Sequence, residues 1–144
     1  MNNMGGYDIE DLSVGMSASF AKTVTEADIV LFAGVSGDTN PVHLDAETAA
    51  TTMFGERIAH GMLSAGFISA VLGSKMPGPG TIYMSQTLKF KAPVKIGDTV
   101  KATAEITELV PEKKRVILKT TCTVAGKVVL EGEATMMATS SAAK

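Results

Sequence analysis

The sequence has 144 residues, of which 45% are hydrophobic and 19% are charged, a composition typical of one globular domain. Thirteen Lys and Arg residues against fifteen Asp and Glu residues give a net charge of −2, and the densest basic run, Lys113–Arg115, is short. A nucleic-acid partner normally requires a strong basic surface, so we exclude one. One cysteine and two histidines are too few for an intrachain disulfide or a zinc cluster, and we predict no metal site.

Small polar residues occupy both ends of the chain, and we expect one domain over residues 7–138 with flexible ends at 1–6 and 139–144. The stretch Met1–Glu10 is polar and acidic and lacks the layout of a signal peptide. The apolar stretches are too short to cross a bilayer. These observations predict a cytoplasmic protein without a membrane partner.

The first half of the chain is mostly helical in pattern, and we expect helices over residues 26–36, 46–52 and 61–72. Thr25 begins the first helix with a capping box, and Gly37 ends it. Asp45 is placed to cap the second helix. The third helix is apolar on nearly all faces, which is typical of a helix that is buried on most sides.

The second half alternates between apolar and polar residues with the period of a β-strand. The residues expected to share a face within four successive strands are Ile82, Met84, Leu88 and Phe90; Val100, Ala102, Ala104 and Ile106; Val116, Leu118, Thr120, Cys122 and Val124; and Val128, Leu130, Ala134 and Met136. We expect these strands in meander order, after an earlier strand at Ser17–Val24. Helices followed by strands indicate an α+β fold, in which one long apolar helix is wrapped by a curved antiparallel sheet.

Both histidines stand beside groups that can carry chemistry. Pro41 stiffens the loop that contains Asp38 and His43, so these two side chains can hold and deprotonate a water molecule. At the beginning of the buried helix, the N–H of Gly61 can stabilise a negative oxygen, and a ligand meets no Cβ there. Spacing alone leaves an alternative open, in which Asp38 only forms a turn and His60 only caps the helix.

Three stretches of the sequence, Asp38–Asp45, Arg57–Leu63 and Ile82–Val94, closely resemble the MaoC-like hydratases. The nearest resemblance is to the single-domain (R)-specific enoyl-CoA hydratases that supply polyhydroxyalkanoate synthesis. It extends from about Val14 to Met137 and includes an Asp-x-Asn-Pro-x-His motif that is followed by His-Gly-Met. The resemblance implies a hotdog fold, which matches the architecture above, and a homodimer with sites between its subunits.

By position, the resemblance implies that Asp38 and His43 are the catalytic pair and that the N–H of Gly61 is the oxyanion donor. It leaves open which member of the pair is the base and what His60 does. The implied reaction is reversible hydration of a trans-2-enoyl-CoA to the (R)-3-hydroxyacyl-CoA, with CoA as part of the substrate and no cofactor. The residues expected to bind substrate are Ser69, Leu72, Tyr83 and Met136.

The acyl chain is expected to run along the apolar helix, where Ser69 and Leu72, three residues apart, share a face. The bulk of Leu72 and Met136 predicts a closed pocket for short chains of about four to six carbons. Two other functions remain open. A 3-hydroxyacyl-ACP dehydratase would use the same residues, and a non-catalytic acyl-thioester-binding hotdog module would be expected to lack the Asp38–His43 pair.

Overall fold

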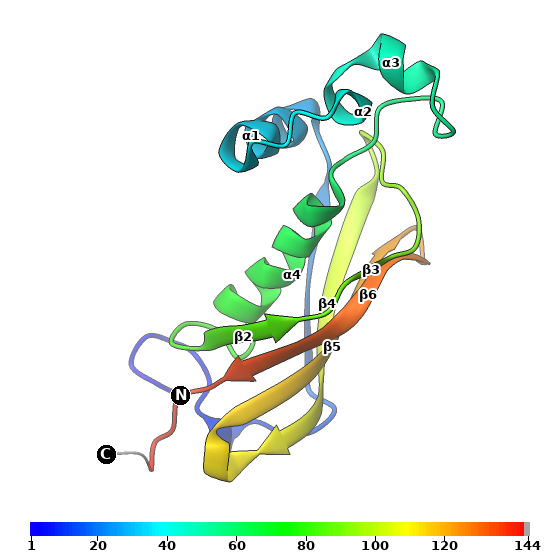
Figure 1. Ribbon diagram of the computed structural model, residues 1–144. Coiled ribbons are helices and arrows are strands. Elements are labelled where there is room, and N and C mark those ends of the chain that lie inside the picture. The colour runs from blue at the N-terminus through cyan, green and yellow to red at the C-terminus, as the bar shows by residue number, and fades with distance from the viewer. Residues whose placement is uncertain (143–144) are drawn as a thin grey trace.

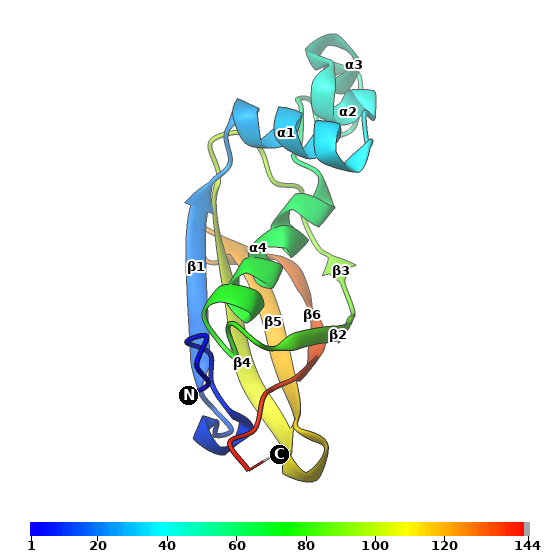
Figure 2. The same ribbon diagram turned by 90° about the vertical axis from the view of Figure 1, so that its left-hand side faces the viewer.

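The computed structural model describes residues 1–142 and has an α+β architecture in which one sheet curves around a long helix (Figures 1 and 2). The helices are α1 (Glu26–Ser36), α2 (Pro41–Leu44), α3 (Ala46–Ala50) and α4 (Gly61–Ser74). The strands are β1 (Ser17–Thr23), β2 (Ile82–Gln86), β3 (Lys89–Phe90), β4 (Thr99–Val110), β5 (Arg115–Val124) and β6 (Lys127–Met137). The predicted fold class is confirmed.

The sheet is antiparallel and has the strand order β1-β4-β5-β6-β2, with β3 also paired to β6. The predicted meander therefore holds only for β4, β5 and β6. The prediction was wrong for the first of the four strands, Ile82–Phe90, which does not pair with β4. Both edges of β4 are already paired, with β1 and β5. The chain that leaves α4 pairs instead with the free edge of β6.

The segment from Ile82 to Phe90 was predicted to be one strand with one inward face, and this is wrong. The register shifts after Tyr83, and β2 and β3 are separated at Thr87. Ile82 and Phe90 are 57% and 51% exposed, so their faces are open to solvent in the single chain. The break occurs where the Thr87 carbonyl approaches Gly132 so closely that a Cβ would not fit there.

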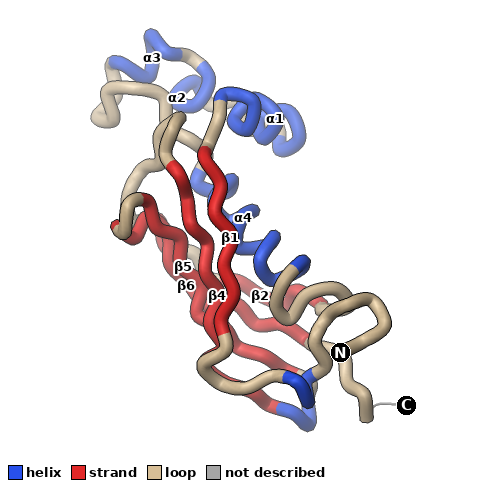
Figure 3. The backbone as a smooth tube through the Cα atoms, turned by 180° about the vertical axis from the view of Figure 1, so that it is seen from behind, coloured by secondary structure: helices blue, strands red, loops and turns tan. Residues whose placement is uncertain are grey.

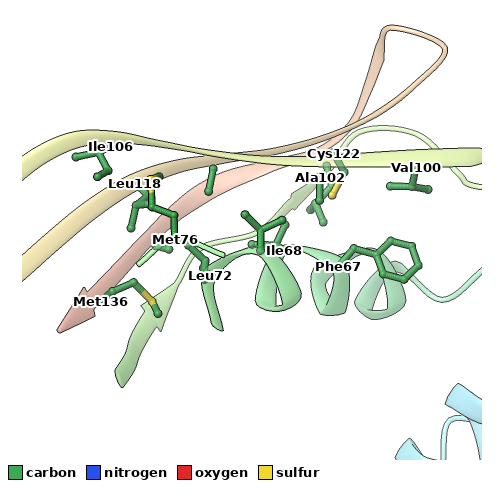
Figure 4. Packing of buried hydrophobic residues seen from close by; sticks show 14 of the residues in the cluster. Phe67, Ile68, Leu72, Met76, Val100, Ala102, Ile106, Leu118, Cys122 and Met136 are labelled. Carbon is green, nitrogen blue, oxygen red and sulfur yellow. The ribbon is translucent and has the colours of Figure 1, made fainter. Parts of the chain in front are cut away.

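The core lies between α4 and the concave face of the sheet (Figure 4). The predicted inward faces of β4 and β5 are buried except at Val124, which is half-buried. Cys122 lies among the buried residues with its thiol 3.6 Å from the Ser64 carbonyl. Burial raises the pKa of this thiol to about 12, so Cys122 behaves as a small apolar side chain. The side chains of α4 in this core include Phe67, Ile68, Val71 and Leu72.

The helices α1, α2 and α3 lie beyond the end of the sheet, next to the beginning of α4 (Figure 1). We call residues 25–60 the helical overhang. The capping box at Thr25 and the left-handed Gly37 after α1 are both present as predicted. Asp45 caps α3, which ends at Ala50 because the following residues form turns. The one-turn helix α2 was not predicted, since four residues are too few to show a period.

Both ends of the described chain make contacts that composition did not predict. The Asn2 side chain donates to the Pro79 carbonyl at 2.8 Å, and Ser140 donates to Glu10 at 2.6 Å. Residues 143–144, within the predicted flexible C-terminal end, lie outside the described residues. Within residues 1–142, none of the helices combines the length and apolar character needed to cross a membrane.

Candidate active site

A cavity of about 540 Å³ lies between the helical overhang, the beginning of α4 and the segment that follows β3. This volume is in the range that holds small-molecule ligands, and most of the side chains around it are apolar. The residues that line it are Asp38, His43, Met53, Phe54, Ile58, Ala59, His60, Gly61, Met62, Ser64, Phe90, Lys91, Ala92, Pro93, Val94, Val129 and Leu130. The cavity thus brings together Asp38, His43 and Gly61 from two distant parts of the chain.

His43 is carried by α2, a single turn that would not persist alone in water. The turn begins at Asn40, whose side-chain oxygen accepts the Val42 N–H at 3.1 Å. Pro41 occupies the first helical position, where its fixed φ suits a helix and its missing N–H leaves no donor unpaired. The sequence Asn-Pro therefore builds a local cap that presents His43.

The segment Arg57–Ile58 fixes this turn from outside. The Arg57 Nε–H donates to the His43 carbonyl at 2.6 Å, and the Ile58 N–H donates to the Val42 carbonyl at 3.2 Å. His43 Nδ1 lies 2.8 Å from the Ile58 carbonyl. Because a carbonyl only accepts, Nδ1 carries the proton in the neutral ring and Nε2 keeps a free lone pair. His43 is 8% exposed and presents this base to the cavity that it lines.

Asp38 lies in the loop between α1 and α2 and has an exposed side chain. Its Oδ1 accepts the Asn40 N–H at 3.2 Å, and its carbonyl accepts a hydrogen bond from His60 Nε2 at 2.9 Å. One ligand atom from each of Asp38, His43 and His60 lies within 4.8 Å of the other two. Two groups bound to the same water lie about 4.5 Å apart, so this cluster can hold one water molecule.

The same cluster also bears on the prediction of no metal site. A carboxylate and two imidazoles are donors that suit a transition-metal ion. The sequence separates Asp38 and His43 from His60, so counting histidines did not reveal that the three meet. The absence of a metal site therefore stays a prediction.

Gly61 is the first residue of α4, and its N–H makes no hydrogen bond within residues 1–142. The 14 residues of α4 add a helix dipole that favours negative charge at this end. A Cβ on Gly61 would lie 2.6 Å from Phe90 Cε1, which is too close for a real side chain. The expected reason for this glycine was the approach of a ligand; in the structure the Phe90 ring already lies where a Cβ would be.

Sequence reasoning missed two supports of the site, Phe90 and Arg57. The Arg57 guanidinium donates twice to the Glu26 carboxylate, at 2.8 and 2.7 Å, in the first turn of α1. These hydrogen bonds lower the pKa of Glu26 and raise the pKa of Arg57. The pair therefore stays ionised at neutral pH and connects α1 to the residues that hold His43.

The four residues predicted to bind substrate do not line this cavity. Leu72 and Met136 are 0% and 1% exposed and belong to the core between α4 and the sheet. Ser69 is exposed, so it does not share its surroundings with Leu72 as the helical spacing predicted. Tyr83 is 39% exposed on β2, where its hydroxyl donates to Gln86. Within a single chain, the structure separates these residues from the Asp38–His43 pair.

Comparisons with known proteins agree with the resemblance in the motifs. A family model described as "MaoC like domain" matches residues 12–132. An (R)-specific enoyl-CoA hydratase of Rhodospirillum rubrum is 69% identical over 128 residues, which cover 89% of each chain. The unliganded R-hydratase PhaJ1 of Pseudomonas aeruginosa superposes with a TM-score of 0.89 at 51% identity, covering 94% of this chain and 87% of that one. The Aeromonas caviae (R)-hydratase involved in PHA biosynthesis superposes with a TM-score of 0.87 at 42% identity, covering 90% and 98%.

Proposed function

The chain belongs to the MaoC-like domain family, and from this premise we propose that it is an (R)-specific enoyl-CoA hydratase. The enzyme is a hydro-lyase that adds water reversibly to a trans-2-enoyl-CoA and forms the (R)-3-hydroxyacyl-CoA. The observation that carries the proposal is the meeting of Asp38, His43 and Gly61 at one apolar cavity. The product serves fatty-acid or polyhydroxyalkanoate metabolism, the latter in line with the A. caviae relative.

The proton transfers fall to His43 and Asp38. The Nε2 lone pair of His43 accepts a proton from a water molecule that the Asp38 carboxylate also holds, while the water oxygen bonds to C3 of the substrate. The electron pair of the C2=C3 bond moves toward the thioester oxygen. The imidazolium then returns its proton to C2, so both added groups come from one water. Asp38 stabilises the positive ring during this step.

The N–H of Gly61 faces the charge that develops on the thioester oxygen. The N–H is unpaired within residues 1–142, and it lies at the positive end of the α4 dipole. A preorganised donor of this kind commonly lowers the barrier by roughly 3 kcal/mol. The largely apolar lining of the cavity strengthens this interaction, because it lowers the local dielectric constant around the oxygen.

The reaction requires no metal and no redox cofactor, because a neutral imidazole and a carboxylate suffice to move a proton near neutral pH. CoA enters as part of the substrate. We further propose that the enzyme acts in the cytoplasm, as an enzyme of acyl-CoA metabolism like its hydratase relatives.

A homodimer is the proposed assembly. β2 is an edge strand that pairs only with β6 among the described strands, and its side chains are largely exposed. Ile82 and Met84 are 57% and 44% exposed there, so this open edge carries apolar side chains that a partner could cover. A second copy would cover this strand and bring its surroundings to the site. Light scattering at micromolar concentration should give twice the monomer mass of 14.9 kDa, and a monomer would contradict the assembly.

Purified protein mixed with crotonyl-CoA tests the activity. We expect loss of the ultraviolet absorbance of the conjugated enoyl thioester, and chiral analysis should identify (R)-3-hydroxybutyryl-CoA. An (S) product, release of free CoA or an unchanged spectrum would each contradict the proposal. The same assay with crotonyl-ACP separates the alternative carrier, because a 3-hydroxyacyl-ACP dehydratase would turn over the ACP thioester faster.

A further inference from the structure

His60 contacts both of the proposed proton-transfer residues, yet it has no step in the reaction above. We propose that His60 is a positioning residue, which holds the main chain of Asp38 and the ring of His43 next to Gly61. The inference rests on the proposed function. It gives a role to the one motif histidine whose purpose the sequence left open.

The first contact is a hydrogen bond to the loop that carries Asp38. His60 Nε2 lies 2.9 Å from the Asp38 carbonyl, and a carbonyl only accepts, so Nε2 carries the proton. The other hydrogen bonds of Asp38 within residues 1–142 are local, to the Ser36 hydroxyl and the Asn40 N–H. The His60 bond spans 22 positions in the chain. It therefore ties the Asp38 loop to the beginning of α4.

The second contact is a stack with the proposed base. The rings of His60 and His43 have centroids 3.9 Å apart and are inclined by 28°. Phe32 packs on His60 at 4.8 Å and 51°. His43 is thus restrained through its Nδ1–H bond to Ile58 and through its stacked face, and both restraints orient Nε2.

The third observation separates this role from simple packing. His60 is 2% exposed, and its Nδ1 is buried without a hydrogen-bond partner within residues 1–142. A buried acceptor without a partner destabilises the fold, and a phenyl ring would fill similar space without that cost. The imidazole is therefore favoured here for what Nε2 donates. Because His60 directly precedes Gly61, the same residue links the proton-transfer pair to the oxyanion donor.

Two substitutions separate the hydrogen bond from the packing. His60→Phe keeps a stacking ring and loses the donor, whereas His60→Gln loses the ring and keeps an N–H at about the same reach. With crotonyl-CoA, we expect His60→Phe to lower kcat by about 10- to 100-fold with KM changed less than about threefold. His60→Gln should lose less activity than His60→Phe. The logarithm of its kcat should lie at least about a third of the way from the His60→Phe value back to the wild-type value. Phe32→Leu, which alters the packing on His60 but removes none of its hydrogen bonds, is the control and should stay within about threefold of wild type.

Equal kcat values for His60→Phe and wild type, or equal losses in His60→Phe and His60→Gln, would overturn the proposal. A measurement that does not need activity is ¹⁵N NMR of the imidazole rings in the wild-type protein. We expect the Nε2–H form for His60 and the Nδ1–H form for His43. The Nδ1–H form for His60 would show that Nε2 does not donate to the Asp38 carbonyl, and this would overturn the proposal. The result uses the wild-type protein and does not depend on whether a variant folds. Absence of hydration by the wild type would instead count against the proposed function.

Discussion

The core around α4 and the helical overhang are held together by different forces. The core contains apolar side chains that are almost fully excluded from water, such as Ile68, Leu72 and Leu118 (Figure 4). The overhang projects beyond the sheet (Figure 3). Ile29 and Ala59 join it to the same core, but its site residues are positioned by hydrogen bonds from Arg57 and His60 to main-chain carbonyls. Hydrophobic burial is non-directional, whereas these bonds fix angles and distances.

This difference separates stability from activity. Removing an apolar side chain from the core leaves a cavity and weakens the whole domain. Removing a polar group from the overhang leaves most of the burial intact but displaces the atoms that react. We therefore expect core variants to change the free energy of unfolding most and overhang variants to change kcat most.

The catalytic pair gives the largest expected effect. Asp38→Asn and His43→Gln should lower kcat for crotonyl-CoA by about 100-fold or more, because each removes a group that moves the proton. Their melting temperatures should stay close to that of the wild type. Asp45→Asn is the matched control, since Asn also caps a helix, and it should keep both properties. Retention of more than about a tenth of wild-type turnover in either pair variant would refute the assignment.

A methyl group at Gly61 gives the next largest effect. Gly61→Ala places a Cβ 2.6 Å from Phe90, so either the ring or the beginning of α4 must move. We expect kcat to fall by about 10-fold or more, as expected when an oxyanion donor is displaced. Gly66→Ala is the control, because its Cβ would meet open space in the same helix. Adding Phe90→Ala should restore part of the activity; no recovery would show that contact with Phe90 is not the cause.

Leu72→Ala tests the core around α4, the other region of the comparison. Leu72 is fully buried in the core, so its loss should lower the free energy of unfolding by about 2–5 kcal/mol in urea titrations. Leu31→Ala removes the same atoms from a residue that is 70% exposed on α1 and should cost little. Turnover of crotonyl-CoA by folded Leu72→Ala should stay near wild type. A gain for octenoyl-CoA would instead support the sequence-based prediction that the acyl chain passes Leu72.

The Glu26–Arg57 pair gives the smallest expected effect, and the size of this effect depends on pH. Hydrogen bonds from Arg57 lower the pKa of Glu26, so the pair stabilises the fold above the unfolded pKa of Glu and loses that contribution as pH falls through the lowered value. The melting temperature of Glu26→Gln should be below wild type at pH 7, and the difference should shrink as the pH falls below the ordinary pKa of Glu and vanish below the lowered pKa of Glu26. Glu56→Gln, which breaks only an exposed pair with Lys95, is the control. A constant difference at all pH values would contradict the role of the pair.

Sequence patterns predicted the parts of the fold that depend on neighbouring residues. The capping box at Thr25, the stop at Gly37 and the alternation in β4 and β5 all follow from local periods and conformations. The order of strands did not, because pairing depends on which edge is free after β4 and β5 have met. The two-residue period also failed to predict burial at the sheet edge, where the side chains of β2 and β3 are largely exposed.

The resemblance in the motifs was sufficient to predict which residues meet at the candidate site. Asp38, His43 and Gly61 meet at one cavity. The bonds that support them were not predictable, because Arg57 and His60 donate to carbonyls 14 and 22 positions away and leave no pattern in the sequence. Residues three apart on a helix differ by about 60° around its axis, and the boundary between core and surface falls between Ser69 and Leu72.

The central claim is that one water, held by Asp38 and His43, supplies both groups that add to the substrate. Hydration of crotonyl-CoA in D₂O, followed by NMR of the product, tests this claim most directly. Because one imidazole takes the deuteron and returns it, we expect one deuterium at C2, on the same face as the new C3 hydroxyl, in a single diastereomer of the (R) product. Deuterium on the opposite face, or an equal mixture of both diastereomers, would contradict the account.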